Sequence, residues 1–359
     1  MVAFSILAGG YDVFIATYLF NTATSSLSLV AKHPSGPNPS WISLHPTNRS
    51  VLYATNEISS GGLQSFNIDA EGVVSSAVQT ISSGGDSPAF ASALSTGEVA
   101  VFNYGSGNGR IVRTTSPTTF DDSAPLITFP VQSSTSVSHP HMALEYNGEV
   151  FVPDLGGDTI WRLGRTSYTG GWKIQGSFPQ PKGSGPRHIR VSNNRLFALH
   201  ELSSTLTVQS IPPAPNGTST IFQSVSIVPP DQPQGAIFAA GEIQIPTPTK
   251  RFPVPYIYVS NRNVGVQDPR GDSIAIFEHV NQGTRSEGLK LVNQVFTGID
   301  QIRGMEFGPA DRGAEEFLVA AGVAGTAGTL VFKRTDGGRN LELVAKNLDI
   351  ATRTSFVWV

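Results

Sequence analysis

The sequence predicts an all-β protein, a single seven-bladed β-propeller with four-stranded antiparallel blades over residues 1–359, and three observations carry this prediction. The composition favours strands and turns, because the chain has 37 Gly and 25 Pro while charged residues make up only 14%. Strand–turn–strand units recur about every 50 residues, which is the period expected for such blades. The two ends of the chain are complementary, since each lacks a strand that the other supplies.

The repeat is clearest in the first two strands of each unit. Segments such as WISLHPTNRSVLYATNE and RHIRVSNNRLFALHELS each contain two short strands joined by a tight turn. The second strands are apolar runs, for example VLYAT and LFALH, as expected for strands buried between neighbouring blades. The first strands are expected to begin at Ser40, Ala89, His141, Arg187, Gly241 and Arg303, which are spaced 46 to 62 residues apart.

The seventh unit is divided between the ends of the chain. Near the N-terminus, FSILAGGY, VFIATYLF and SLSLVAK are typical of second, third and fourth strands, with no first strand before them. The C-terminal TSFVWV is typical of a first strand and is expected to begin at Ser355. We therefore expect this strand to complete the N-terminal blade, which closes the ring and removes two open sheet edges. A pair of β-sandwich domains, the alternative, would not explain this complementarity.

Composition and charge exclude several classes of function. The net charge of −3 gives no basic surface for nucleic acid or an anionic membrane, and no apolar run reaches the ~20 residues that span a bilayer. The absence of Cys excludes disulfides, thiolate catalysis and Cys-ligated metals. The first residues, MVAFSILAGGYDVF, lack the basic region of a signal peptide, so we expect a cytoplasmic protein. Homo-oligomerisation stays open.

Charged residues at the strand ends predict a site at one mouth of the central channel. The first strand of every blade lines this channel, so residues about 50 positions apart in the sequence meet around its axis. The beginning of the first strands and the end of the second strands both face the same mouth. The expected catalytic residues are His141, Arg187, Glu201 and Arg262. The expected substrate contacts are His188, Glu242, Arg303, Asn261, Glu57 and Tyr104.

Two structural interpretations compete with this site. A polar residue ends the second strand in most units, as in Asn56, Asn103 and Asp154, and such a recurring residue is typical of a turn that satisfies backbone groups. The charges could also form an ion-pair network that merely fills the channel.

The same segments carry a family resemblance that covers nearly the whole chain. The elements HPH, GPRH, HELSST and YVSNR, in that order, resemble the lactonase family of seven-bladed propellers. That family includes one kind of 6-phosphogluconolactonase and the fungal 3-carboxy-cis,cis-muconate cyclase. The opening NPSWISLHPTNRSVLYATNE and the final SFVWV resemble the fungal cyclase branch most. The resemblance implies catalytic roles for His141, Arg187, Glu201 and Arg262, while the sixth unit departs from the pattern because IRGMEFGPADRGAEEFLVAAGV lacks the polar strand end.

These residue types suit a small carboxylate or lactone substrate. Two guanidiniums match the geometry of carboxylates, and a His can transfer a proton near neutral pH. The same groups could close a lactone on a 3-carboxy-cis,cis-muconate-like diene acid or open a lactone by activating water. Cyclisation is the main hypothesis. Lactone hydrolysis is the first alternative, and a non-catalytic interaction platform is the second.

No cofactor and no metal are expected. The sequence has no G-x-S-x-G nucleophile motif, and His139 and His141 are two residues apart on a strand, so they would face opposite sides. A metal site built from Glu57, Asn103 and Asp154, like the acidic and Asn ligands of metal-dependent gluconolactonase propellers, is the alternative.

Overall fold

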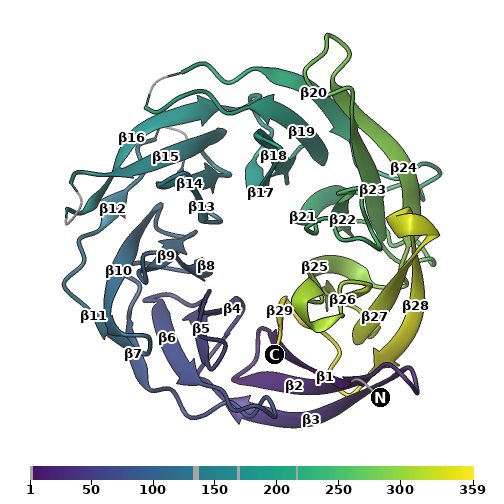
Figure 1. Cartoon of the computed structure of the whole chain (residues 1–359), viewed down its shortest axis with the longest axis horizontal. Coiled ribbons are helices and arrows are strands. Elements are labelled where there is room, and N and C mark those ends of the chain that lie inside the picture. The colour runs from purple at the N-terminus through teal and green to yellow at the C-terminus, as the bar shows by residue number, and fades with distance from the viewer. Residues whose placement is uncertain (1–2, 132–136, 168–169, 216) are drawn as a thin grey trace.

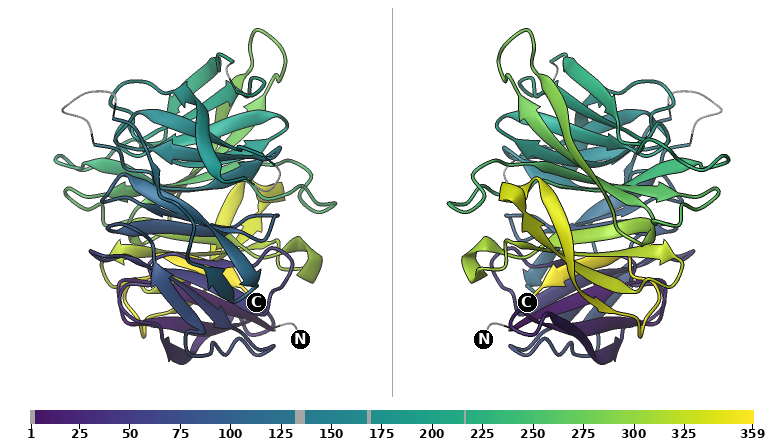
Figure 2. Two further views of the ribbon diagram at one scale, coloured as in Figure 1. Left: turned by 90° about the vertical axis from the view of Figure 1, so that its left-hand side faces the viewer. Right: turned by 90° about the vertical axis from the view of Figure 1, so that its right-hand side faces the viewer.

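The seven-bladed propeller is confirmed. The computed structural model describes residues 3–131, 137–167, 170–215 and 217–359, and in these residues the chain forms seven antiparallel sheets. The sheets surround a central axis as blades, with one strand of each nearest the axis (Figure 1). In the side views the C-terminus lies beside the purple N-terminal strands (Figure 2).

The strands of each blade follow one another from the axis outward. The closing blade is β29 (Ser355–Trp358), β1 (Ala3–Gly9), β2 (Phe14–Asn21) and β3 (Ser26–Pro34). The next blade is β4 (Ile42–Leu44), β5 (Val51–Asn56), β6 (Gly62–Asn67) and β7 (Gln79–Ser82). It is followed by the blade of β8 (Pro88–Ala93), β9 (Val99–Asn103), β10 (Asn108–Ser116) and β11 (Thr119–Asp121). The blade after that is β13 (Leu144–Tyr146), β14 (Glu149–Asp154), β15 (Thr159–Arg165) and β16 (Trp172–Pro179). The last three are β17 (Pro186–Ser192), β18 (Arg195–His200), β19 (Thr205–Ser210) and β20 (Ile221–Ser226); β21 (Phe238–Gln244), β22 (Ile257–Asn263), β23 (Ser273–Val280) and β24 (Gly288–Phe296); and β25 (Asp300–Phe307), β26 (Phe317–Ala324), β27 (Thr329–Thr335) and β28 (Asn340–Asn347).

The predicted ring closure is also confirmed. Strand β29 pairs with β1 in an antiparallel register that sets Val357 opposite Leu7. The Trp358 ring packs edge-on against Phe4 and Phe20, at centroid distances of 5.8 and 6.3 Å. The chain ends are therefore joined by backbone hydrogen bonds and by an aromatic cluster.

One blade differs from the expected four strands. Strand β11 covers only the outer half of β10, from Arg113 to Ser116, which leaves the beginning of β10 without a partner on that side. The short strand β12 (Ile127–Thr128) pairs there with Asn108 and Gly109, so this sheet has five strands.

The second strands are buried as predicted, and the core lies between blades. Every residue of β5, β9, β14 and β22 is buried. Apolar clusters join the faces of neighbouring sheets, as where Phe20 of β2 packs edge-on against Phe317 of β26. No helix in the described part of the chain is long and apolar enough to cross a membrane.

An extra residue interrupts the inner strand pairing in four blades. Between β17 and β18, Pro186 lies opposite His200 and His188 opposite Leu199, so Arg187 has no partner of its own. Equivalent shifts occur at Ala89, at Arg303 and within Gly241–Glu242. Such β-bulges change the direction of a side chain, and these four bulges fall at strand starts that the sequence pattern predicts.

Candidate active site

Glu201 links two arginines from different blades at the centre of the propeller. Nη1 of Arg187 forms an ion pair with Oε2 of Glu201, and Nη2 of Arg262 lies 2.8 Å from Oε1. Burial alone would raise the pKa of Glu201, but the charges and hydrogen bonds of the two guanidiniums outweigh it and lower the pKa to about 2. Glu201 is therefore ionised across the neutral range and holds both arginines in place.

The local backbone explains how these three side chains meet. Strands β17 and β18 are joined at Asn193 and Asn194, whose φ values of 49° and 55° define the two-residue turn of a tight hairpin. The tight turn predicted in this segment is therefore confirmed. This turn fixes the register that brings Arg187 and Glu201 to the same end of the hairpin. The Nε of Arg187 donates to the carbonyl oxygen of Gly241 at 2.9 Å.

The bulge in β21 orients the arginines from both blades. Nε and Nη2 of Arg262 donate to the carbonyl oxygen of Ala240 at 3.2 and 3.1 Å, next to the Gly241 carbonyl that Arg187 uses. A Cβ on Gly241 would lie only 2.3 Å from the carbonyl oxygen of Ile302, so only glycine fits there. Two adjacent carbonyls of one bulge thus fix two guanidiniums.

Glu57, Arg303 and Tyr11 form a second group at the same mouth. The Tyr11 hydroxyl donates to Glu57, with both carboxylate oxygens 3.1 Å away, and Nη2 of Arg303 lies 3.4 Å from Oε2. Burial raises the pKa of Tyr11 to about 12, so its hydroxyl remains a donor. Tyr11 is not among the predicted contacts, although it follows a second strand just as Glu57 and Glu201 do.

Tyr104 and His141 stand beside the arginines. The Tyr104 ring stacks on His139 at 4.3 Å and meets His141 edge-on at 5.7 Å. Burial raises the pKa of Tyr104, and the charge of Glu201 raises it further. His141 is only 3% exposed; burial and then the charge of Arg187 lower its pKa well below the usual value. His141 is therefore neutral at neutral pH.

The mouth carries an excess of positive charge. Three guanidiniums face two carboxylates in this cluster, so the formal sum is +1. The three guanidiniums come from three consecutive blades: Arg187 lies on β17, Arg262 on β22 and Arg303 on β25, the inner strand of its blade. This charge favours an anionic ligand.

Asn261 does not join the predicted substrate contacts. Its amide nitrogen donates to the carbonyl oxygen of Ile227 at 2.6 Å, in the connection that enters its own blade. Adjacent residues of a strand point to opposite sides, so the position that directs Arg262 to the axis directs Asn261 into the blade.

The polar residues at the ends of other second strands also form hydrogen bonds with backbone groups. Asn56 donates to the carbonyl of Pro37, Asn103 to that of Ser83, and Asp154 accepts from the backbone nitrogen of His139. These contacts support the interpretation of a recurring turn residue. They also occupy the side chains that the alternative metal site would need. Among the described residues, no group of three or more His, Asp or Glu side chains is arranged to hold a metal ion.

His188 and Glu242 lie beneath the cluster rather than in it, which corrects their expected position. His188 is fully buried against the rings of Trp41 and Phe90, at centroid distances of 5.3 and 5.9 Å. Glu242 follows the bulged Gly241 and points toward the opposite face of the disc. The neighbouring His200 is also buried, with Nε2 3.1 Å from the Thr207 hydroxyl, and burial lowers its pKa to about 4.

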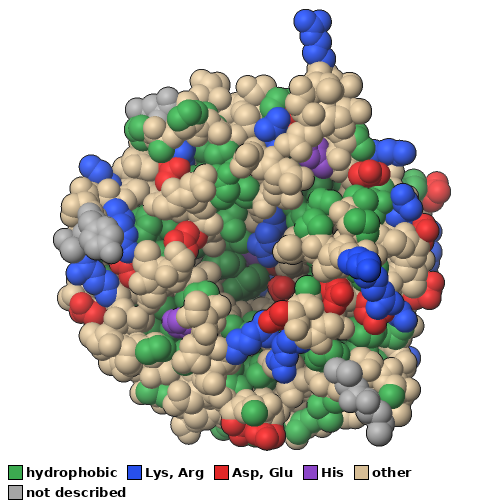
Figure 3. All heavy atoms as spheres, viewed as in Figure 1, with side chains coloured by type: hydrophobic (Ala, Val, Ile, Leu, Met, Phe, Trp, Pro, Cys, Tyr) green, Lys and Arg blue, Asp and Glu red, His purple; other side chains and the backbone are tan. Residues whose placement is uncertain are grey.

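The opposite mouth of the channel holds a cavity of about 550 Å³, visible as the central hollow in Figure 3. Its walls are the far ends of the first strands and include Trp41, Met142 and Trp358. Glu306 lines it as well, and burial raises the pKa of this carboxyl to about 7. Apolar side chains thus share the walls of this cavity with charged ones, among them Arg190, Glu242 and Glu306.

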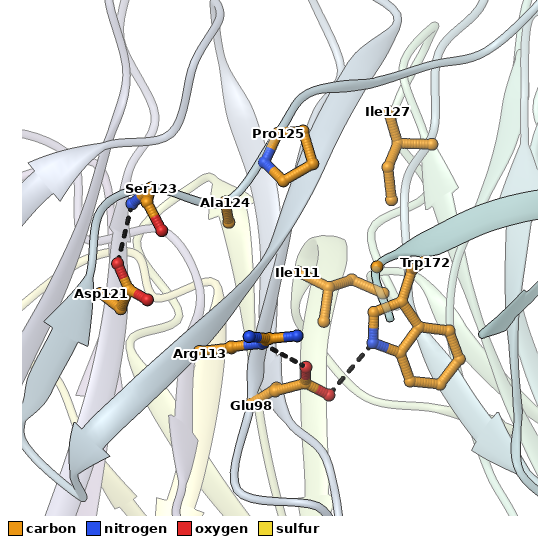
Figure 4. A pocket seen from close by; sticks show the side chains of 10 residues that line it. Glu98, Ile111, Arg113, Asp121, Ser123, Ala124, Pro125, Ile127 and Trp172 are labelled. Atoms are coloured by element: carbon orange, nitrogen blue, oxygen red, sulfur yellow. Dashed lines mark hydrogen bonds and ion pairs between the residues drawn. The ribbon is translucent and has the colours of Figure 1, made fainter. Parts of the chain in front are cut away.

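A smaller hollow of about 240 Å³ lies between two blades, near β10 and β16 (Figure 4). Its carboxylate, Glu98, accepts a hydrogen bond from Nε1 of Trp172 at 3.0 Å and forms ion pairs with Arg165 and Arg113. These partners belong to both blades, so Glu98 ties the blades together.

Comparisons with known proteins identify the family. A protein from Lactobacillus plantarum aligns over 100% of both chains at 21% identity, with a TM-score of 0.82. The periplasmic gluconolactonase of Pseudomonas aeruginosa aligns over 100% of this chain and 99% of its own at 20% identity, with a TM-score of 0.82. A candidate 6-phosphogluconolactonase from Bacteroides uniformis aligns over 100% of both chains at 20% identity, with a TM-score of 0.81. At these identities the structures show a shared fold. No curated protein matches the chain. Residues 5–358 match the family described as lactonase, 7-bladed beta-propeller, and the chain therefore belongs to that family.

Proposed function

We propose that the protein hydrolyses a small lactone that carries an anionic group, such as a phosphorylated or acidic sugar lactone. The observation that carries this proposal is the cluster of Arg187, Glu201, Arg262 and Arg303 beside the neutral His141. The guanidiniums supply an anion-binding surface with fixed geometry, and an uncharged imidazole supplies a base. The family match and the gluconolactonase structures support hydrolysis over the other reactions.

The proposed reaction needs only groups of this cluster and a water molecule. His141 takes a proton from water as the water oxygen attacks the lactone carbonyl carbon, and a guanidinium stabilises the oxyanion that forms. The ring carbon–oxygen bond then breaks. The leaving alkoxide takes the proton back from His141, which gives the hydroxy acid and restores the neutral imidazole. A second guanidinium holds the anionic group of the substrate.

Cyclisation of a muconate-type diacid, the main hypothesis from the sequence, has no support from the comparisons. Ring closure and ring opening use the same residue types, so the cluster alone favours neither. The lactonase relatives shift the proposal to hydrolysis.

The first test measures acid release by EDTA-treated protein. We expect hydrolysis of 6-phosphogluconolactone or of glucono-1,5-lactone above the spontaneous rate, and we expect His141→Ala to lower kcat by about 100-fold or more because the base is lost. Separate reactions contain 3-carboxy-cis,cis-muconate. Consumption of the diene without any lactone hydrolysis would restore the cyclase hypothesis, and inactivity on all substrates would favour the non-catalytic platform. Activity that requires added metal would overturn the proposed chemistry.

A further inference from the structure

Three buried side chains form a continuous hydrogen-bonded row through the centre of the propeller. Nδ1 of His141 lies 3.2 Å from Nε2 of His188, and Nδ1 of His188 lies 2.8 Å from Oε2 of Glu242. All three are 3% exposed or less. The row runs from the charged mouth to the cavity on the opposite face, which Glu242 lines.

The chemistry of Glu242 decides where the protons lie. Burial would raise its pKa, but His188 and Arg190 outweigh burial and lower it, so Glu242 is a carboxylate that can only accept. Nδ1 of His188 must therefore carry a proton. Burial lowers the pKa of His188, so the ring is neutral and its Nε2 is an acceptor.

The same logic fixes the tautomer of His141. Because Nε2 of His188 accepts, Nδ1 of His141 must be the donor across the 3.2 Å contact. The neutral His141 ring then keeps a lone pair on Nε2. This Nε2 atom has no hydrogen-bond partner among the described residues. It is not fully buried either, so it keeps contact with solvent.

Contacts around His188 and Glu242 hold the row in place. Trp41 and Phe90 both meet His188 edge-on, and Oε1 of Glu242 accepts from the backbone nitrogen of Ile243 at 2.9 Å. Glu242 and His188 are thus fixed on both sides, and neither touches the mouth where substrate would bind.

We infer that Glu242 and His188 are positioning residues that hold His141 in the tautomer whose Nε2 faces the substrate as the base. The inference rests on the proposed function for its kinetic consequence, but the tautomer itself does not depend on any substrate. It also gives Glu242 a second role, because its negative charge stabilises the imidazolium that forms when His141 accepts a proton.

Several other charged groups act on the row and must be considered in any pH profile. His141 faces Arg187, Arg262 and Arg303, which disfavour its protonation. Arg190 and Glu306 face Glu242 from the opposite cavity. Since Glu306 reaches Glu242 only through space and does not touch either histidine, Glu306 offers a matched control.

The kinetic test compares Glu242→Gln with Glu306→Gln. The amide that Glu242→Gln introduces can donate to Nδ1 of His188, which reverses both histidines and places the proton on Nε2 of His141. We therefore expect Glu242→Gln to lower kcat for lactone hydrolysis by about 100-fold or more with KM within about threefold, and to shift the acid limb of kcat/KM to lower pH. Glu306→Gln should leave kcat unchanged. Equal losses in both variants would overturn the inference, because they would reflect general disturbance of the channel.

Nitrogen-15 NMR of the histidine rings tests the tautomer without substrate. We expect the Nδ1–H form for both His141 and His188 in the unmodified protein and the Nε2–H form of His141 in Glu242→Gln. His188→Gln provides a second variant if Glu242→Gln does not fold. An Nε2–H tautomer of His141 in the unmodified protein would refute the inference even if the protein hydrolyses lactones. The expected tautomers in a protein without lactonase activity would instead refute the proposed function alone.

Discussion

Replacement of Arg187 by Ala is expected to reduce kcat/KM for lactone hydrolysis by about 1,000-fold or more. The change removes one of the guanidiniums that would bind the substrate or its oxyanion, and losses of about 10²–10³ follow removal of a single oxyanion donor. It also frees Glu201 from one of its two partners and leaves the Gly241 carbonyl without its donor. Glu201 would then turn fully to Arg262, which withdraws a second guanidinium from the substrate. Steady-state kinetics with the lactone identified in the first test will measure this loss.

Arg187 is 3% exposed, so the effect on stability must be separated from the effect on catalysis. The bulge directs the side chain inward, to Glu201 and the carbonyl oxygen of Gly241. Arg187→Lys keeps the charge but loses the planar fork, and we expect it to retain an intermediate activity. Arg49→Ala is the control at the opposite cavity and should keep full activity. If Arg49→Ala abolished activity while Arg187→Ala did not, the substrate would bind on the opposite face.

The repeat spacing predicted the blades and the positions that meet at the axis. Strand starts expected at Ala89, Arg187, Gly241 and Arg303 coincide with bulges, and Glu57, Tyr104, Glu201 and Arg262 all lie around the same mouth. This succeeded because a propeller repeats its geometry in every blade, so one position defines a ring.

The direction of individual side chains could not be predicted in the same way. A strand pattern alternates with period two, and a single bulge shifts the alternation by one residue. In β21 the bulge holds both Gly241 and Glu242, and it turns Glu242 away from the mouth where the pattern placed it. Asn261 was misplaced for the opposite reason, since regular alternation directs it into the blade.

Tyr11 shows a different limit of sequence reasoning. It holds the same position in the closing blade as Glu201 in its own blade, but a tyrosine after two glycines has no charge to mark it as part of a site. Its role appears only through the two 3.1 Å contacts with Glu57, a residue 46 positions away.

The carboxylates around the axis offset the repulsion between the buried arginines. Three arginines near the axis would repel one another in a low-dielectric channel. Glu201 and Glu57 offset this repulsion at the mouth, and Glu242 supplies negative charge beneath it. The carboxylates thus reduce the electrostatic cost of placing three arginines together in the folded state. The mouth still keeps a net positive charge that can bind an anionic ligand.

Deletion of the last six residues, 354–359, is expected to prevent stable folding. The deletion removes β29, so β1 loses its pairing partner along Ile6 to Gly9. It also removes the buried Phe356 and Trp358, and truncation of such aromatic residues costs about 3–5 kcal/mol each, against a total stability of about 5–15 kcal/mol. We expect aggregation or a fall in Tm of more than about 10 °C, measured by thermal unfolding and size-exclusion chromatography.

The deletion also opens the contact between the closing blade and the next one. The Thr354 hydroxyl donates to the carbonyl of Ser40 at 2.6 Å, and the backbone nitrogen of Ile42 donates to the Ser355 hydroxyl at 3.1 Å. Val357→Thr is the control, since it preserves the backbone pairing and should change Tm by only a few degrees. A synthetic peptide of residues 353–359 should restore part of the lost Tm by adding a strand to the exposed edge of β1. A truncated protein with unchanged Tm and elution volume would show that β29 does not close the ring in solution.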